Sequence, residues 1–128
     1  MRLLLDTHIF LWLLNAPENL SESARTTCAD GENTLLLSTA SVWELQIKHQ
    51  RGRLTLDVSL EQILRDQADI YTLLPINASH VLQLSALPLH HHDPFDRILI
   101  AQAIVENATL VTVDDEIRRY KDLVTLLC

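Results

Sequence analysis

Four acidic side chains stand at positions where a carboxylate is expected to need a partner. They are Asp6, Glu44, Asp96 and Asp114. Asp6 and Asp114 directly follow short apolar runs, whereas Glu44 and Asp96 share helical faces with apolar residues. A buried carboxylate is costly unless it is neutralised. Because hard divalent cations such as Mg²⁺ bind carboxylate oxygens and water, this pattern favours a cation site built from these acids.

The hydrophobic pattern predicts the elements that must position these acids. Continuous apolar runs, typical of strands in parallel sheets, cover Leu3–Leu5, Thr34–Ser38 and Thr109–Val113, with a weaker run at Tyr71–Leu74. Helical stretches lie between the runs, and the clearest is Asp93–Asn107, which starts with a capping Asp and a Pro. Strands that alternate with helices predict an α/β fold, a three-layer α/β/α sandwich with a mostly parallel central sheet.

Such a sheet also predicts that these acids meet. Ligands of open parallel sheets bind beyond the carboxyl ends of the strands. Asp6 and Asp114 stand at two such ends, Glu44 lies in the helical stretch Thr39–Gln50 that follows another strand, and Asp96 lies in a first helical turn. Each acid has a simpler interpretation as a cap, a first-turn acid or a strand end. Their convergence on one edge favours the metal site.

Composition limits the remaining classes of protein. The 128 residues suit a single domain spanning 1–128, and the aromatic content of 5% predicts an aliphatic core. The net charge of −7 argues against a broad basic face for nucleic acid. Cys28 and Cys128 lie far apart without a metal-binding spacing, so we expect reduced thiols and a cytoplasmic protein. The chain has no apolar run of membrane-spanning length, and we expect no membrane association.

Four short motifs are specific when they are taken together. They are Leu4-Leu5-Asp6-Thr7-His8, Ser38-x-x-Ser41-x-x-Glu44-Leu45, the run from Asp93 to Ala103, and Leu110-Val111-Thr112-Val113-Asp114. In this order and spacing, over nearly the whole chain, they resemble the motifs of PIN-domain ribonucleases. Within that family the chain is similar to the VapC-type toxins of type II toxin–antitoxin systems.

The resemblance implies an endoribonuclease that depends on Mg²⁺ or Mn²⁺. Its catalytic and metal-binding residues fall on Asp6, Glu44, Asp96 and Asp114. Asp93 remains an alternative to Asp96, and Asp115 an alternative to Asp114. The polar side chains expected next to the ligands are Thr7, Ser41, Asp93, Thr112 and Asp115.

The resemblance also implies partners. These are an RNA substrate, a cognate antitoxin whose C-terminal segment covers the site, and a second copy of the toxin in a homodimer. The basic side chains that we expect to guide RNA are Lys48, Arg51, Arg53 and Arg97. The alternative function is that of a non-catalytic PIN-like module that binds RNA or protein.

The residue types favour direct attack by water, since no Ser, Cys or Tyr nucleophile has a base at hand. The tract His90–His92 invites a zinc interpretation. Three consecutive side chains of a strand or helix cannot converge on one ion, although His90 and His92 could do so from an extended segment. We interpret the tract as a polar loop beside the site that contacts RNA or antitoxin.

Overall fold

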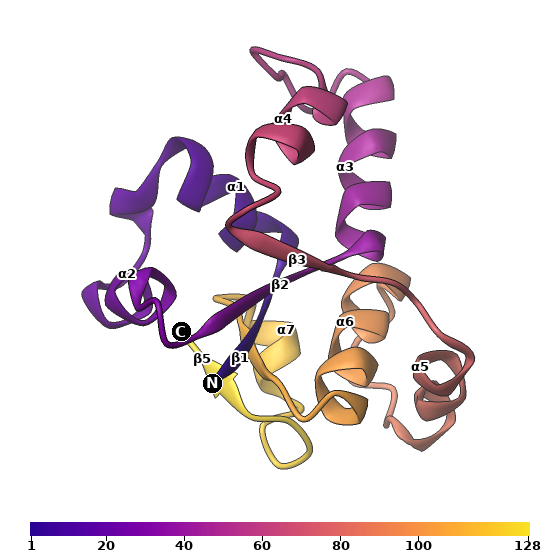
Figure 1. Ribbon diagram of the computed structural model, residues 1–128. Helices are drawn as coiled ribbons and strands as arrows, with labels where there is room; N and C mark the ends of the chain where they lie inside the picture. The colour runs from indigo at the N-terminus through magenta and orange to yellow at the C-terminus, as the bar shows by residue number, and fades with distance from the viewer.

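The computed structural model describes residues 1–128, and it is built from short strands connected by helices (Figure 1). The strands are β1 (Arg2–Leu5), β2 (Thr34–Ser38), β3 (Tyr71–Leu74), β4 (Thr109–Val111) and β5 (Leu126–Leu127). The α-helices are α1 (Thr7–Asn15), α2 (Glu22–Ala29), α3 (Thr39–Gln50), α4 (Leu60–Asp66), α5 (Ala78–Gln83), α6 (Pro94–Val105) and α7 (Asp115–Arg118). Short 3₁₀ helices cover Pro17–Asn19 and Leu84–Ala86.

The strands form one sheet in the order β3-β2-β1-β4-β5, and every neighbouring pair is parallel. Parallel pairing needs crossover connections, which the helices provide. The predicted α/β/α sandwich is therefore confirmed, with a sheet that is parallel throughout. The chain places β2 and β3 on one side of β1, and β4 and β5 on the other. In sheets of this kind, ligands bind in the crevice beyond the strand ends where the order reverses, which here is the place at the carboxyl ends of β1 and β4.

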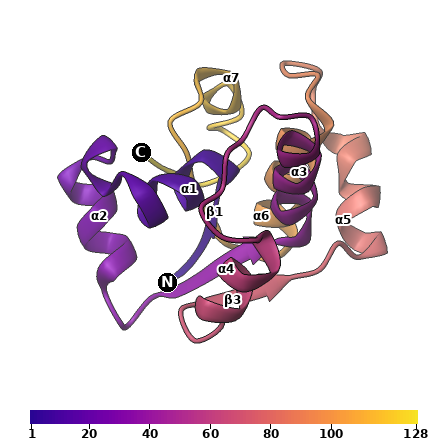
Figure 2. The ribbon, with the colours of Figure 1, turned by 90° about the horizontal axis from the view of Figure 1, so that it is seen from above.

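Successive residues of the central strands point into two separate apolar layers. Leu4 and Leu36 pack with residues of α6 on one face of the sheet. Leu3, Leu5 and Leu35 pack with residues of α1 and α2 on the other face. Figures 1 and 2 show α1 and α2 on one side of the strands and α5 and α6 on the opposite side. Both layers are mainly aliphatic, as the composition predicts.

The helices that cover the sheet are short. The longest, α3 and α6, have 12 residues each. None of the helices combines the length and the apolar character that crossing a membrane requires. The two cysteines are free: Cys28 of α2 is buried in the apolar layer between that helix and the sheet, and Cys128 is exposed.

Strand β4 ends at Val111, two residues before the end of the apolar run Thr109–Val113. The backbone N–H of Thr112 still donates to the carbonyl of Leu127 at 2.9 Å, so pairing with β5 continues to that residue. The hydroxyl of Thr112 then accepts a hydrogen bond from the backbone N–H of Asp114 at 3.1 Å. This local bond turns the chain out of the sheet and makes Asp114 the N-cap of α7.

Candidate metal centre

Asp6 stands at the carboxyl end of β1 and is also the N-cap of α1. Its backbone N–H donates to the carbonyl of Val111 at 3.0 Å, which extends the pairing of β1 with β4 by one residue. Its Oδ1 accepts from the backbone N–H of His8 at 3.3 Å, and its Oδ2 accepts from the hydroxyl of Thr112 at 2.7 Å. Only 4% of Asp6 is exposed. The carboxylate is therefore fixed at the crevice between β1 and β4.

The first turn of α6 distinguishes Asp93 from Asp96. Asp93 is the N-cap, and its Oδ1 accepts from the backbone N–H groups of Phe95 at 2.8 Å and of Asp96 at 3.3 Å. Pro94 follows at the first helical position, where the missing N–H costs no hydrogen bond. Asp96 is buried, and its carboxylate is not used for capping. This geometry favours Asp96 as a metal ligand and gives Asp93 the role of holding the helix start.

A similar contrast separates the neighbours Asp114 and Asp115. The Oδ2 of Asp114 lies 3.9 Å from Nε2 of His91, on the side of the molecule where Asp96 lies. The side chain of Asp115 is 90% exposed and pairs with Arg118 at 3.2 Å. Asp115 therefore points away from the other acids, and the geometry favours Asp114 as the ligand.

Glu44, the fourth predicted acid, lies on α3 and is buried. Its Oε2 forms an ion pair with Lys48 at 3.2 Å, whereas its Oε1 is buried without a hydrogen-bond partner. The hydroxyl of Thr7 donates to the hydroxyl of Ser41 at 2.9 Å, which fixes the first turn of α3 next to the residue that follows Asp6. An unpartnered buried carboxylate oxygen is unusual and is the kind of atom that a cation or an ordered water satisfies.

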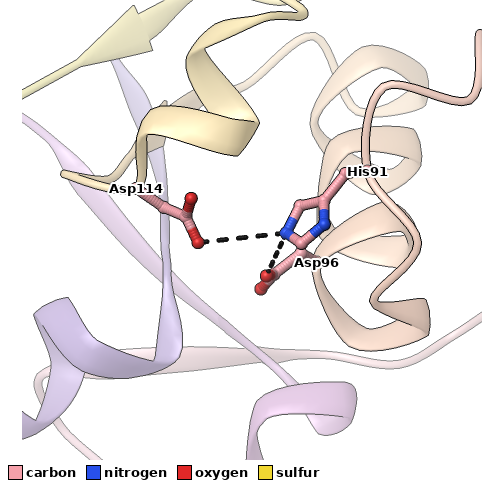
Figure 3. Close-up of side chains that lie close together, drawn as sticks. All are labelled: His91, Asp96 and Asp114. Carbon is pink, nitrogen blue, oxygen red and sulfur yellow. Dashed lines mark hydrogen bonds and ion pairs between the residues drawn. The ribbon is translucent and has the colours of Figure 1, made fainter.

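His91 is the side chain in this cluster that sequence reasoning missed. Its Nε2 lies 2.8 Å from Oδ2 of Asp96, and one ligand atom from each of His91, Asp96 and Asp114 lies within 4.8 Å of the others. Figure 3 shows one ring nitrogen of His91 facing both carboxylates. The sequence predicted a polar loop here, which is correct, but not that the loop folds back over the first turn of α6. The sequence signal that could have indicated this contact is the presence of a histidine five residues before Asp96.

Burial and mutual repulsion change the acidity of the carboxyl groups. Removal from water is the main cause that raises the pKa of Asp96 to about 7, and the neighbouring charges of Asp6 and Asp93 add to it. Removal from water also raises the pKa of Asp6, although the hydrogen bond from Thr112 acts in the opposite direction. Like charges are thus held together in a site where a cation would relieve their repulsion.

The loop before α6 is held by Tyr120 and Arg97. The phenolic oxygen of Tyr120 accepts the backbone N–H groups of both His90 and His91 at 3.0 Å and donates to the carbonyl of Pro88 at 2.6 Å. Arg97 donates to the carbonyls of Pro88 at 3.1 Å and of His91 at 3.3 Å. These bonds occupy the guanidinium within the protein, so the geometry favours a structural role for Arg97 over the expected RNA contact.

The other basic residues expected to contact RNA lie at and beyond the end of α3. Lys48 pairs with Glu44 and is one-third exposed, and Arg51 and Arg53 are exposed. Arg51 and Arg53 therefore keep free charges at the surface, whereas the charge of Lys48 is partly committed to Glu44.

The donor set fits a divalent cation. Oxygens of Asp96 and Asp114 lie close together, and the charge of Asp6 is near enough to raise the pKa of Asp96. The pKa of Asp6 is raised as well. The orphaned Oε1 of Glu44 offers a further oxygen from α3. Oxygen donors of this kind are typical of sites for Mg²⁺ and Mn²⁺.

The chain is an α/β/α protein with a parallel central sheet, and its acids lie at the point where the strand order of the sheet reverses. Comparison with protein families identifies the family. The family model for the PIN domain matches residues 3–123. The chain therefore belongs to the PIN domain family, which confirms the resemblance found in its motifs. Among curated proteins, no sequence matches the chain significantly.

Solved structures show the same fold along the full length. VapBC2 from Rickettsia felis, bound to a DNA fragment from its promoter, superimposes with a TM-score of 0.73 at 20% identity, covering 99% of this chain and 98% of that one. VapBC-1 from nontypeable Haemophilus influenzae gives 0.66 at 22% identity, with 99% and 97% covered. A toxin–antitoxin complex from Klebsiella pneumoniae gives 0.62 at 15% identity, with 98% and 95% covered. At these identities the likeness shows the fold alone.

Proposed function

We propose that the chain is a metal-dependent endoribonuclease formed by one PIN-like domain over residues 1–128. The observation that carries the proposal is the cluster of Asp96 and Asp114, with the charge of Asp6 near enough to raise the pKa of Asp96, in a chain that belongs to the PIN domain family. The orphaned Oε1 of Glu44 supports it as a fourth ligand on the α3 side. The ion is Mg²⁺ or Mn²⁺.

The protein side chains have separate tasks in this mechanism. A bound divalent cation supplies activation of the attacking water and stabilisation of the charge that develops on the phosphate. Asp6 binds the cation with a carboxylate whose orientation is fixed by Thr112. Asp96 or Asp114 accepts the proton that the water loses. Asp114 is the better placed to pass this proton on to solvent, because 35% of its side chain is exposed.

Cleavage of RNA by the purified protein tests the proposal. We expect cleavage of a mixed-sequence RNA with Mg²⁺ or Mn²⁺, no cleavage with EDTA, and loss of cleavage in the variants Asp6→Asn and Asp96→Asn. Asp115→Asn is the matched control, since its side chain is exposed and paired with Arg118. Cleavage that survives EDTA, or survives Asp6→Asn together with Asp96→Asn, contradicts the proposal. RNA binding without cleavage would favour the non-catalytic module.

We further propose that this nuclease is the toxin of a type II toxin–antitoxin system. The family and the likeness of fold to a toxin–antitoxin complex from Klebsiella pneumoniae support this role. The partner is a cognate antitoxin whose C-terminal segment covers the acidic crevice. Coexpression with the product of the neighbouring gene should give a stable complex in which cleavage is suppressed. Free cleavage in the presence of every neighbouring gene product contradicts the toxin role.

A homodimer is the expected assembly, and one apolar surface suits it. Trp43 of α3, Val81 of α5 and Ile76, which precedes α5, are 60%, 51% and 37% exposed. They line a cavity of about 310 Å³ together with Pro94 and Phe95 at the start of α6. Exposed apolar patches of this kind mark protein interfaces. Sedimentation should show a dimer for the natural chain and a monomer for Trp43→Asp, whereas a monomeric natural chain contradicts the assembly.

A further inference from the structure

The position of His91 differs from that of its two histidine neighbours. Its Nε2 lies 2.8 Å from Oδ2 of Asp96 and 3.9 Å from Oδ2 of Asp114 (Figure 3). His90 packs against the ring of Tyr120, and His92 is exposed. Only the middle histidine therefore points a ring nitrogen at the two carboxylates.

The protein holds His91 in this position before any ligand arrives. The buried Tyr120 accepts its backbone N–H, and Arg97 donates to its carbonyl, so the main chain is fixed from both sides. The backbone N–H of Asp93 donates a long hydrogen bond of 3.4 Å to Nδ1 of His91. A ligand side chain whose supporting bonds fix it in advance binds with less loss of conformational freedom.

Two of the three separations between the donor atoms suit ligands of one ion. Two atoms bound to the same cation at about 2.1 Å can lie at most about 4.2 Å apart. The separations from Nε2 of His91 to the oxygens of Asp96 and Asp114, 2.8 and 3.9 Å, fall within this limit. The distance between the two carboxylate oxygens is no larger than 4.8 Å. A small movement of the partly exposed side chain of Asp114 would bring this distance within the same limit.

We propose that His91 is itself a metal ligand, through Nε2, in the site formed by Asp96 and Asp114; this inference rests on the metal site of the proposed function. An imidazole nitrogen binds the divalent first-row transition ions, Mn²⁺ less tightly than the later members, whereas Mg²⁺ prefers oxygen donors. His91 thus makes this site select Mn²⁺ over Mg²⁺. When Nε2 binds the ion, the ring carries its proton on Nδ1, which gives up the long hydrogen bond that Nδ1 accepts from the backbone N–H of Asp93.

Manganese binding to the purified full chain, without RNA, tests the proposal. Titration calorimetry gives the dissociation constants for Mn²⁺ and Mg²⁺, and pulsed electron paramagnetic resonance detects a nitrogen bound to Mn²⁺. We expect nitrogen coupling in the natural protein and its loss in His91→Ala. In the same variant the dissociation constant for Mn²⁺ should rise by at least about tenfold, while that for Mg²⁺ changes by less than about twofold.

Two further variants exclude simpler explanations. His92→Ala removes the exposed neighbour and should leave both constants and the nitrogen coupling unchanged. His91→Gln can still donate a hydrogen bond to Asp96 but is a poor ligand for Mn²⁺, so it should behave like His91→Ala. Normal Mn²⁺ binding in His91→Gln, tighter binding of both ions in His91→Ala, or the absence of nitrogen coupling would each overturn the proposal.

The result is independent of the cleavage assay. A protein that shows nitrogen coupling but cleaves no RNA retains His91 as a ligand and refutes the nuclease. A protein that cleaves RNA without nitrogen coupling retains the nuclease and refutes His91 as a ligand.

Discussion

The hydroxyl of Thr112 donates to Oδ2 of Asp6 at 2.7 Å, which connects the ends of β1 and β4 across 106 residues of sequence. Thr112 is completely buried. Its oxygen also accepts the backbone N–H of Asp114 at 3.1 Å. One hydroxyl group therefore orients the carboxylate of Asp6 and the chain segment that carries Asp114.

Replacement of this hydroxyl by a methyl group should affect both stability and the site. Thr112→Val keeps the shape of the side chain but leaves the buried Asp6 carboxylate without its donor. We expect the free energy of unfolding to fall by about 1–3 kcal/mol, measured by urea denaturation. The pKa of Asp6 should rise further, since the bond from Thr112 lowers it. Thr112→Ser keeps the hydroxyl and should retain most RNA cleavage, and equal cleavage in both variants would refute this role.

The adjacent acids Asp114 and Asp115 provide a matched pair for the site itself. We expect Asp114→Asn to reduce RNA cleavage by at least about 100-fold. Removing a group that only hydrogen-bonds a metal ligand usually costs about 10–100-fold, and removing the ligand itself should cost more. Asp115→Asn should change cleavage by less than about twofold, because its side chain is exposed beside Arg118. Initial rates with saturating Mn²⁺ measure both effects. Equal losses of cleavage in the two variants would show that cleavage depends on the negative charge of this segment and not on a metal ligand at Asp114.

The raised pKa of Asp96 predicts how stability depends on pH when metal is absent. In the folded protein this carboxyl keeps its proton up to about pH 7, whereas its ordinary pKa is 3.8. The folded state therefore binds more protons than the unfolded state in this range. The contribution of Asp96 to the stability of the fold should therefore be highest below about pH 4. This contribution should decline as the pH rises towards 7.

Thermal unfolding in EDTA at a series of pH values measures this dependence. Asp96→Asn removes the titrating group, so its melting temperature should decline less than that of the natural protein over the same range. Saturating Mn²⁺ should reverse the decline at neutral pH, since the cation binds the ionised carboxylate. Parallel curves for the natural protein and Asp96→Asn would contradict the raised pKa.

Tyr120 predicts a separate effect on the loop before α6. Tyr120→Phe leaves the backbone N–H groups of His90 and His91 without their shared acceptor. We expect the free energy of unfolding to fall by about 1–3 kcal/mol, measured by denaturation. Amide hydrogen exchange of both residues should become faster. His90→Ala is the control, because it removes the ring contact with Tyr120 and keeps the backbone bonds. Unchanged exchange in Tyr120→Phe would show that other contacts hold the loop.

The sequence was sufficient for those parts of the fold that depend on local pattern. Apolar runs predicted the central strands, including Thr34–Ser38 with its observed bounds, and the cap at Asp93 predicted the start of α6. Strand ends and helical periodicity then placed Asp6 and Asp96 at one edge. The end of β4 was predicted two residues late, because the turn depends on a hydrogen bond from Asp114 to Thr112 that hydropathy does not encode.

The parts that the sequence could not predict depend on distant contacts. The position of His91 requires Tyr120, which lies 29 residues further along the chain, to bind the loop backbone. Arg97 was expected to contact RNA, but it is occupied by carbonyl groups of the same loop. The pairing of Glu44 with Lys48 follows the familiar i, i+4 helical spacing, and the sequence contained that signal.

Anomalous X-ray scattering from crystals grown with Mn²⁺ tests the central claim most directly. We expect a peak at the carboxyl ends of β1 and β4, about 2.2 Å from carboxylate oxygens of Asp6, Asp96 or Asp114. The same crystals of Asp96→Asn should lose most of that peak. A map with no peak between these carboxylates at saturating Mn²⁺, or with its strongest peak on another face of the molecule, would contradict the metal site and the function proposed for it.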